Sequence, residues 1–269
     1  MLHYAPITLE KLYFDCVDAQ GNAWIGYGLK LQWLWMTLHA HQSLTHLDGV
    51  LETHWARTKA ASAIQLTPEG LDYACPLFEV QAQPWATPPL LETLYARRRK
   101  SIVWHCLYPH AALVVKRDKN PMLAGQGYVE RLTMTLPPWQ LPIQTLHWGR
   151  FVAQEHSLVW IRWQQQAETT HWVFFNGKKI AKCSFSLSQL HLQEENIFLD
   201  IQAHKTLVKG RPLDQLGGKL GPIHRLLPQK LRQWTEVKWL AKGTLRLPQQ
   251  TVTGWVIHEE VHLAGRTCI

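Results

Sequence analysis

Runs of alternating apolar and polar residues dominate the chain, and few stretches carry the periodicity of a helix. In a strand, alternation places every second side chain on the same face. In the run 29–36, one face of a single predicted strand is apolar: Leu29, Leu31, Trp33, Trp35. Many short strands separated by regular turns are typical of a β-sandwich or barrel. The pattern therefore predicts an all-β fold.

Two motifs predict hairpins. Residues 13–17 and 23–27 are rich in β-forming side chains and flank a turn that contains Gly21 and Asn22. The strand predicted at 170–175 is expected to pair with residues 158–163 and leads into the dipeptide Asn-Gly at 176–177. Asn-Gly is the strongest hairpin signal in the chain, because both residues tolerate the left-handed backbone of a two-residue turn.

Prolines are expected to interrupt regular elements. Pro109 is predicted to form a tight connection between strands at 101–108 and 111–116, because proline cannot donate a ladder hydrogen bond. The best helix candidate lies at 223–234, and Pro228 interrupts it.

The two halves of the chain share a faint repeat. Gly127 and Gly254 lie in similar short motifs, each on a strand that ends in an acidic residue. A repeat of this kind indicates two copies of one structural unit. We expect an N-terminal β module at residues 1–140 and a C-terminal β module at residues 141–269, each of about barrel size and packed closely together.

The composition suits a protein with apolar cavities. The 269 residues are 46% hydrophobic, which is enough for a large core, and only 18% are charged. Tryptophan occurs 14 times. Because a buried indole needs a partner for its N–H group, such an excess indicates aromatic-lined cavities or interfaces rather than core filling alone.

The net charge of +8 raises the question of an anionic partner. The one dense basic run, 97–100, lies between predicted strands, where it is expected to be a solvated hairpin end. A basic helix or a stripe of alternating aromatic and basic residues is absent. We therefore expect no specific nucleic-acid partner, and a peripheral contact with a membrane surface stays open.

Several classes of site lack their signatures. The five cysteines are widely spaced without a Cys-x-x-Cys pair, and the 15 histidines show no metal-ligand spacing. Nucleotide-binding and serine-nucleophile motifs are absent. The sequence thus predicts neither a metal nor a cofactor. The N-terminus does not resemble a secretory signal, so we expect a cytoplasmic protein.

The central stretch carries the first candidate chemistry. Tyr128 and Glu130 are two residues apart, so on a strand they face the same side, and aromatic residues surround them in sequence. A carboxyl in an apolar pocket is expected to stay protonated and to act as an acid. The alternative interpretation is a half-buried structural glutamate whose hydrogen bonds are satisfied within the strand.

A second group of candidates lies near the C-terminus. His258 is expected to accept or relay a proton, and Glu259 supplies another carboxyl. Arg150 is a candidate for orienting a carboxylate or binding an anionic head group. The alternative is an exposed strand end. Two carboxylates that face one cleft would also suit a glycosidase.

The motifs that carry a family resemblance are spread over most of the chain: Trp104-His-Cys106 followed by Pro109, Gly127-Tyr-Val-Glu130, Leu141-Pro-Ile143, Trp148-Gly-Arg-Phe151, Trp172 with Asn176-Gly177, and Gly254 through His258-Glu259. They resemble those of the carotenoid 1,2-hydratase (hydroxyneurosporene synthase), AttH-like and tocopherol cyclase group. The resemblance implies two consecutive lipocalin-like (calycin-like) β modules and non-redox chemistry on isoprenoid double bonds. The hydratases have a Tyr-x-Asp pair in their proposed site, which Tyr128 and Glu130 match except for one extra methylene in the acid.

We therefore predict a cofactor-independent hydratase or cyclase that binds an isoprenoid or polyene substrate in an aromatic-lined cavity. Glu130, assisted by Tyr128, would protonate a double bond, and His258 or Glu259 would remove the final proton. The residues predicted to contact the substrate are Trp104, Trp148, Arg150, Trp172 and Trp255. The alternative is a non-catalytic lipocalin-like carrier of an apolar ligand.

Overall fold

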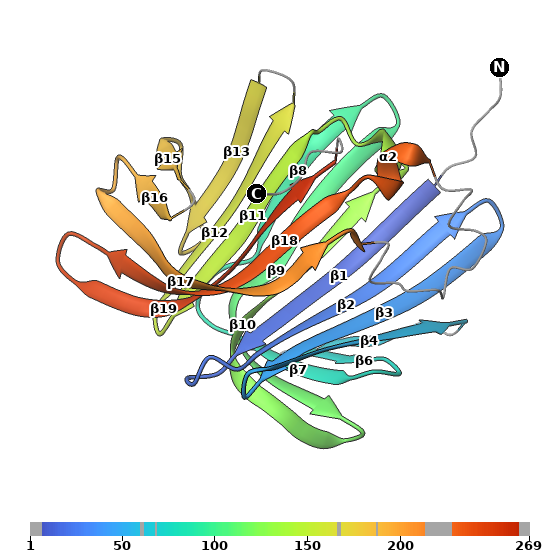
Figure 1. Ribbon diagram of the computed structural model, residues 1–269, viewed down its shortest axis with the longest axis horizontal. Coiled ribbons are helices and arrows are strands. Elements are labelled where there is room, and N and C mark those ends of the chain that lie inside the picture. The colour runs from blue at the N-terminus through green and yellow to red at the C-terminus, as the bar shows by residue number, and fades with distance from the viewer. Residues whose placement is uncertain are drawn as a thin grey trace. The chain divides into compact units, whose positions relative to one another are not determined.

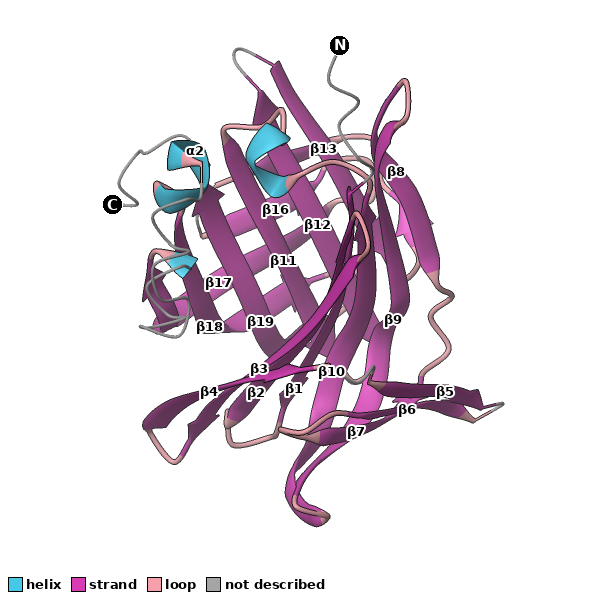
Figure 2. Ribbon diagram, turned by 90° about the vertical axis from the view of Figure 1, so that its right-hand side faces the viewer, coloured by secondary structure: helices cyan, strands magenta, loops and turns pink. Residues whose placement is uncertain are grey.

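Strands fill most of the described chain (Figure 2). The computed structural model describes residues 7–59, 62–67, 69–165, 168–186, 188–212 and 228–263. The chain divides into two compact units, Met1–Gln140 and Leu141–Ile269. Within the described residues, each unit is one antiparallel sheet with its own apolar core. The predicted all-β fold is confirmed.

The N-terminal unit contains ten strands among its described residues. They are β1 (Ile7–Val17), β2 (Ala23–Trp33), β3 (Met36–Leu47), β4 (Val50–Thr58), β5 (Ala63–Thr67), β6 (Gly70–Ala74), β7 (Glu79–Pro84), β8 (Leu90–Arg97), β9 (Lys100–Arg117) and β10 (Asn120–Met134), followed by the 3-10 turn η1 (Pro138–Gln140). Their order is β4-β3-β2-β1-β10-β9-β7-β6-β5, and β8 also pairs with β9 (Figures 1 and 2).

The first predicted hairpin is confirmed, but the prediction that residues 29–36 form a single strand is wrong. Asp18 closes the turn between β1 and β2, because its Oδ1 accepts a hydrogen bond of 2.8 Å from the backbone N–H of Asn22. The run 29–36 is not one strand: β2 ends at Trp33, and Leu34 adopts a left-handed φ of 56° in the turn to β3. Alternation continues across this turn, so it does not reveal the reversal.

The tight connection predicted at Pro109 is also wrong, since β9 continues through it. On one edge of β9, β8 pairs only as far as Cys106 and β7 begins at Ala111. On the other edge, the register with β10 shifts at the same place. Pro109 therefore occupies a position where neither neighbouring strand needs its missing N–H group.

The core of the N-terminal unit fixes the faces of β10. Buried apolar side chains from several strands form this core: Leu12, Phe14, Cys16, Trp24, Leu71, Tyr73, Phe78, Val80, Ala82, Ala111, Leu113, Val115, Leu123 and Val129. Because Val129 faces the core, Tyr128 and Glu130 face the opposite side of the sheet.

The C-terminal unit contains nine strands among its described residues. They are β11 (Thr145–Ala153), β12 (His156–Gln165), β13 (Glu168–Phe175), β14 (Lys178–Lys179), β15 (Cys183–Phe185), β16 (Gln189–Leu192), β17 (Ile197–Gly210), β18 (Thr235–Arg246) and β19 (Thr251–His262). Their order is β14-β13-β12-β11-β19-β18-β17-β16-β15.

The turn prediction in this unit is confirmed. Residues 158–163 pair with 170–175, and Asn176 and Gly177 both adopt left-handed backbone, with φ of 48° and 81°. The predicted helix is much shorter than expected: α2 (Gln229–Arg232) begins directly after Pro228, and residues 223–227 lie outside the described chain. No helix among the described residues is long and apolar enough to cross a membrane.

The core of the C-terminal unit likewise fixes the faces of β19. Its buried members are Phe151, Ala153, Leu158, Trp160, Val173, Ile180, Leu190, Leu192, Ile197, Leu199, Ile201, Ala241, Leu245 and Val256. His258 lies two residues from Val256 and shares its face, whereas Glu259 points to the other face.

The two units repeat one pairing scheme. In each, the first strand lies between the second strand and the last, as β2-β1-β10 and β12-β11-β19. Gly127 and Gly254 lie on the two last strands, where a Cβ atom would approach the carbonyl oxygens of Asp15 and Val152 to 1.8 Å and 2.2 Å. Glycine is therefore required at both positions. The other short match, between Trp24-Ile-Gly and Trp148-Gly, falls on non-equivalent strands.

Candidate functional site

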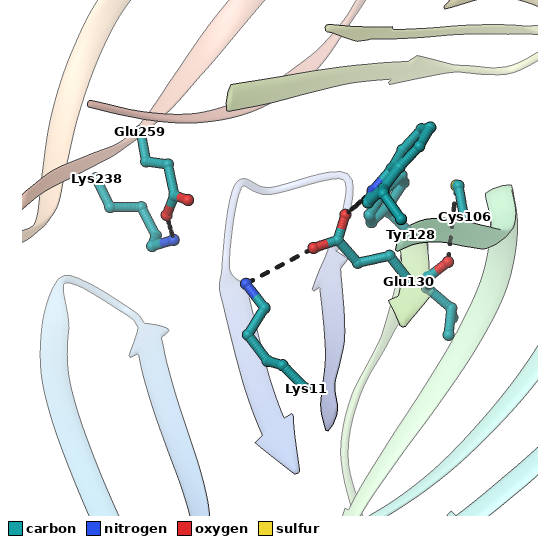
Figure 3. Close-up of polar contacts among 8 residues, drawn as sticks. Lys11, Cys106, Tyr128, Glu130, Lys238 and Glu259 are labelled. Carbon is teal, nitrogen blue, oxygen red and sulfur yellow. Dashed lines mark hydrogen bonds and ion pairs between the residues drawn. The ribbon is translucent and has the colours of Figure 1, made fainter. Parts of the chain in front are cut away.

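In the N-terminal unit, a buried carboxyl collects hydrogen bonds from two aromatic side chains. Glu130 is only 4% exposed. Its Oε2 accepts a hydrogen bond of 2.7 Å from the Tyr128 hydroxyl and one of 2.5 Å from Nε1 of Trp104 on β9 (Figure 3). Three residues that the sequence proposed for the site thus lie in direct contact.

A charged residue on the neighbouring strand completes this group. Lys11 on β1 places its Nζ 3.7 Å from Oε1 of Glu130. The same ammonium lies 5.7 Å from the ring centroids of both Tyr13 and Tyr27. We call Lys11, Tyr13, Tyr27, Trp104, Tyr128 and Glu130 the Glu130 cluster. In it, a positive charge lies between a carboxylate and two aromatic faces.

The contacts of Glu130 are with two hydrogen-bond donors and an ammonium, and its expected role as a protonated acid stays a prediction. The indole of Trp104 can only donate, so a proton on Oε2 would compete with it. A proton on Oε1 would face the ammonium of Lys11. Donors and an opposite charge stabilise a carboxylate against its desolvation, which burial alone does not predict.

Tyr128 is held as a phenol. Complete burial, together with the nearby Cys106 and Glu130, raises the pKa of Tyr128 well above its ordinary value. Its hydroxyl therefore keeps its proton and donates a hydrogen bond to Glu130. Burial likewise raises the pKa of the Cys106 thiol, which donates to the carbonyl oxygen of Val129 and is not a ready nucleophile.

The C-terminal unit contains a cavity of about 260 Å³ whose walls are aromatic and polar. Its lining residues are His147, Trp148, Trp160, Arg162, Phe185, Ser186, Gln189, Leu190, Ile201, Trp239, His258 and Glu259. Three residues that the sequence proposed, Trp148, His258 and Glu259, border it. We call this space the His258 cavity.

His258 is neutral at physiological pH. Its Nε2 lies 3.0 Å from Nδ1 of His204, so one ring donates an N–H to the other, and its ring stacks on Trp239 at 4.9 Å. Burial, with smaller effects from His204 and His147, lowers the pKa of His258 to about 3. A neutral imidazole of this kind can accept a hydrogen bond from a ligand, whereas its lowered pKa makes it a weak proton acceptor.

Glu259 forms an ion pair rather than a free acid. Lys238 on β18, which is 2% exposed, contacts its carboxylate (Figure 3). The ammonium of Lys238 also lies 5.9 Å from a ring centroid of Trp148. Glu259 and His258 both border the His258 cavity, although successive residues of β19 point to opposite faces of the sheet, and their acid–base roles stay a prediction.

The remaining predicted residues lie away from these contacts. Trp172 packs edge-on against Trp163, with ring centroids 5.3 Å apart. Trp255 lies under the ammonium of Lys242 at 5.6 Å, and its carbonyl oxygen accepts a hydrogen bond of 2.8 Å from the fully buried Arg150. These contacts give Trp172, Trp255 and Arg150 packing and structural roles; whether any of them binds substrate stays a prediction.

Sequence reasoning missed the partners of the candidate groups: Lys11, His204, Lys238 and Trp239. Each lies on a different strand from the residue it contacts. Only strand pairing brings them together, and no local pattern announces it. Among the described residues, no group of three or more histidine, cysteine or acidic side chains is placed to hold a metal ion.

Several solved structures share this architecture. An AttH candidate from Nitrosomonas europaea has a TM-score of 0.54 and 9% identity, covering 96% of this chain and 92% of that chain. CghA has a TM-score of 0.60 and 11% identity, with 98% and 90% covered. Kievitone hydratase from Nectria haematococca has a TM-score of 0.54 and 8% identity, with 97% and 90% covered.

No protein-family model and no curated protein sequence matches the chain. At 8–11% identity, the structural likeness establishes the fold and leaves the reaction open. The fold is that of two consecutive lipocalin-like β modules, which the motif resemblance predicted.

Proposed function

We propose that the protein is a hydratase-type enzyme that acts without a cofactor on a double bond of a largely apolar substrate, and that the Glu130 cluster carries out the proton transfers. One observation carries this proposal: a buried carboxylate is fixed by Tyr128 and Trp104 and faces an ammonium that two tyrosine rings flank. A base, an acid and faces that stabilise positive charge are thus in one place.

The contacts suggest a role for each group. In hydration, Lys11 gives a proton to one carbon of the double bond while water adds to the other carbon, and Glu130 takes the proton that this water loses. Transfer of that proton from Glu130 back to Lys11, across 3.7 Å, restores both groups. Tyr128 and Trp104 hold the carboxylate in place. If a hydroxyl of the substrate adds instead of water, the same steps produce a ring.

The acid in this scheme restricts the substrate. An ammonium is a much weaker acid than a carboxylic acid, so it cannot protonate an isolated alkene efficiently. It suits a double bond that conjugation polarises, and the tyrosine faces stabilise the positive charge that spreads over such a system. We therefore favour a conjugated substrate, which includes polyenes. A fold shared with kievitone hydratase is in keeping with this chemistry.

The proposal is tested with water labelled with ¹⁸O. The protein is incubated with a panel of conjugated polyenes and polyphenols, and mass spectrometry detects either a gain of one labelled water or an isomer of equal mass. The Glu130→Gln variant should lose this activity, whereas Glu155→Gln, at an exposed position on the turn after β11, should keep it. Equal turnover by the wild type and Glu130→Gln would refute the assignment.

A second function, carriage of a ligand, is favoured by the His258 cavity. Aromatic walls, a neutral imidazole and the guanidinium of Arg162 suit a small aromatic molecule with a polar or acidic end. A carrier would release its ligand chemically unchanged. The test is mass spectrometry of the molecules that co-purify with the protein, before and after incubation with the same polyenes and polyphenols. A ligand recovered unchanged supports carriage, whereas a gain of one water or an isomer of equal mass supports turnover.

A further inference from the structure

The hairpin between β2 and β3 exposes four consecutive large apolar side chains. Trp33 is 46% exposed, Leu34 60%, Trp35 88% and Met36 43%. Leu34 adopts a left-handed backbone at the tip, and Trp33 pairs with Met36 at the base of the turn. A tight turn normally carries polar residues, so this tip has no explanation in the folding of the unit itself.

The tip borders an apolar groove with a basic rim. The groove encloses about 710 Å³, and its apolar wall includes Trp33, Trp35, Met36 and Leu38. Arg57 and Lys59, at the end of β4, form its charged side. No acidic residue lines the groove, and both basic side chains are exposed without an ion-pair partner in the described chain.

We propose that this hairpin docks on an anionic lipid bilayer, with its tryptophans in the interfacial layer and Arg57 and Lys59 against the lipid head groups. Indole rings favour the membrane–water interface, because one part of the ring is apolar and its N–H group is polar. Basic residues beside them are attracted to the negative surface of anionic lipids. The net charge of +8 adds long-range attraction of the same sign.

Charge favours an anionic bilayer over a second copy of the chain as the partner of this hairpin. A second copy would bring another +8 and the same basic rim to the contact, and the two would repel each other. An anionic surface matches both the apolar tip and its rim. The inference is independent of the proposed function, because binding to vesicles is measured without turnover.

The test is co-sedimentation of the full chain with vesicles. The wild type should bind vesicles of phosphatidylcholine and phosphatidylserine in equal parts, and should bind pure phosphatidylcholine at least tenfold more weakly. Replacing Trp33 and Trp35 together by serine should lower binding to the anionic vesicles at least tenfold. Arg57→Gln with Lys59→Gln should lower binding to the anionic vesicles and leave the weak binding to phosphatidylcholine unchanged.

The matched control is Leu66→Ser, which removes an apolar side chain that is 68% exposed on β5 and should leave binding unchanged. Circular dichroism establishes that each variant is folded. The proposal is overturned if the wild type fails to bind anionic vesicles, or if the tryptophan variant and the control bind equally. A concentration-dependent dimer that the tryptophan variant abolishes, without vesicle binding, would also overturn it and assign the tip to a second copy.

Discussion

The two units treat a buried ionisable group in opposite ways, although each places it on the last strand of the same pairing scheme. In the N-terminal unit, two hydrogen bonds and the ammonium of Lys11 surround the carboxyl group of Glu130. In the C-terminal unit, burial keeps His258 uncharged beside a cavity. Proteins bear the cost of burying an ionisable group either by pairing it or by neutralising it, and this fold does both.

The two lysine–glutamate pairs sharpen this contrast. Lys238 is almost completely buried and contacts Glu259 directly, which is the geometry of a structural ion pair. The side chain of Lys11 is 26% exposed and stands 3.7 Å from Glu130. A looser, partly solvated pair can exchange protons and rearrange, whereas a closed pair mainly holds strands together.

The largest expected effect is on turnover. Replacing Glu130 by Gln keeps the size of the side chain and removes the base, so kcat should fall about 10²- to 10⁴-fold on the substrate that the mass screen identifies. Lys11→Met should cause a loss of similar size, and it should also lower the midpoint of unfolding, because Glu130 is then buried without its cation. Steady-state kinetics and thermal unfolding measure the two properties. A Lys11→Met variant with wild-type kcat would remove the contrast between the two lysines.

The next effect concerns stability. Lys238→Met leaves the carboxylate of Glu259 largely buried without its cation and should lower the free energy of unfolding by about 3–5 kcal/mol. Adding Glu259→Gln to this variant should recover most of the loss, because no uncompensated charge remains. Urea unfolding of the two single variants and the double variant measures the coupling. Additive losses would show that the two residues do not act as a pair.

A third effect depends on pH. Because the pKa of His258 is lowered to about 3 in the folded protein, the unfolded chain binds a proton below about pH 6.5 and the folded chain does not. The resulting stability is complete above that pH and is lost as the pH falls toward 3, by at most about 1.4 kcal/mol per pH unit. His258→Phe should flatten the plot of unfolding free energy against pH; an unchanged slope would contradict a neutral His258.

The smallest effect tests the hydrogen bonds of the Glu130 cluster. Tyr128→Phe removes one donor to a buried carboxylate and should lower the free energy of unfolding by about 1.5–3 kcal/mol. Combining Tyr128→Phe with Glu130→Gln should cost less than the sum of the two changes, since the hydroxyl then has no carboxylate to stabilise. Thermal unfolding of the four proteins provides the cycle.

Local chemistry explains which parts of the fold were predictable. Asn176 and Gly177 specify their own turn, and Asp18 closes another, so both hairpins follow from neighbouring residues. Pro109 was misjudged because its tolerance depends on two strands, β7 and β8, that meet β9 at different places. The turn at Leu34 lacks the usual turn residues altogether.

In the candidate site, too, contacts between sequence neighbours were predictable and contacts between distant residues were not. A spacing of two on a strand places Tyr128 and Glu130 on one face, and the structure confirms their contact. The contact with Trp104 joins residues 26 apart, and Lys11 comes from the other end of the unit, so neither follows from alternation. The surroundings of the Glu130 carboxyl therefore depend on residues that are distant in the sequence, and burial alone does not reveal them.

In each unit the last strand pairs with the first strand, and this pairing has a consequence for protein engineering. Ile7, at the start of β1, lies near the end of β10, since Leu9 pairs with Met134; in the same way Thr145 pairs with His262. Both ends of a unit therefore emerge at the same end of two neighbouring strands in the middle of its sheet. A short linker can join such ends, so new termini can be opened in a distant loop and the order of the strands along the gene rearranged without changing which strands pair.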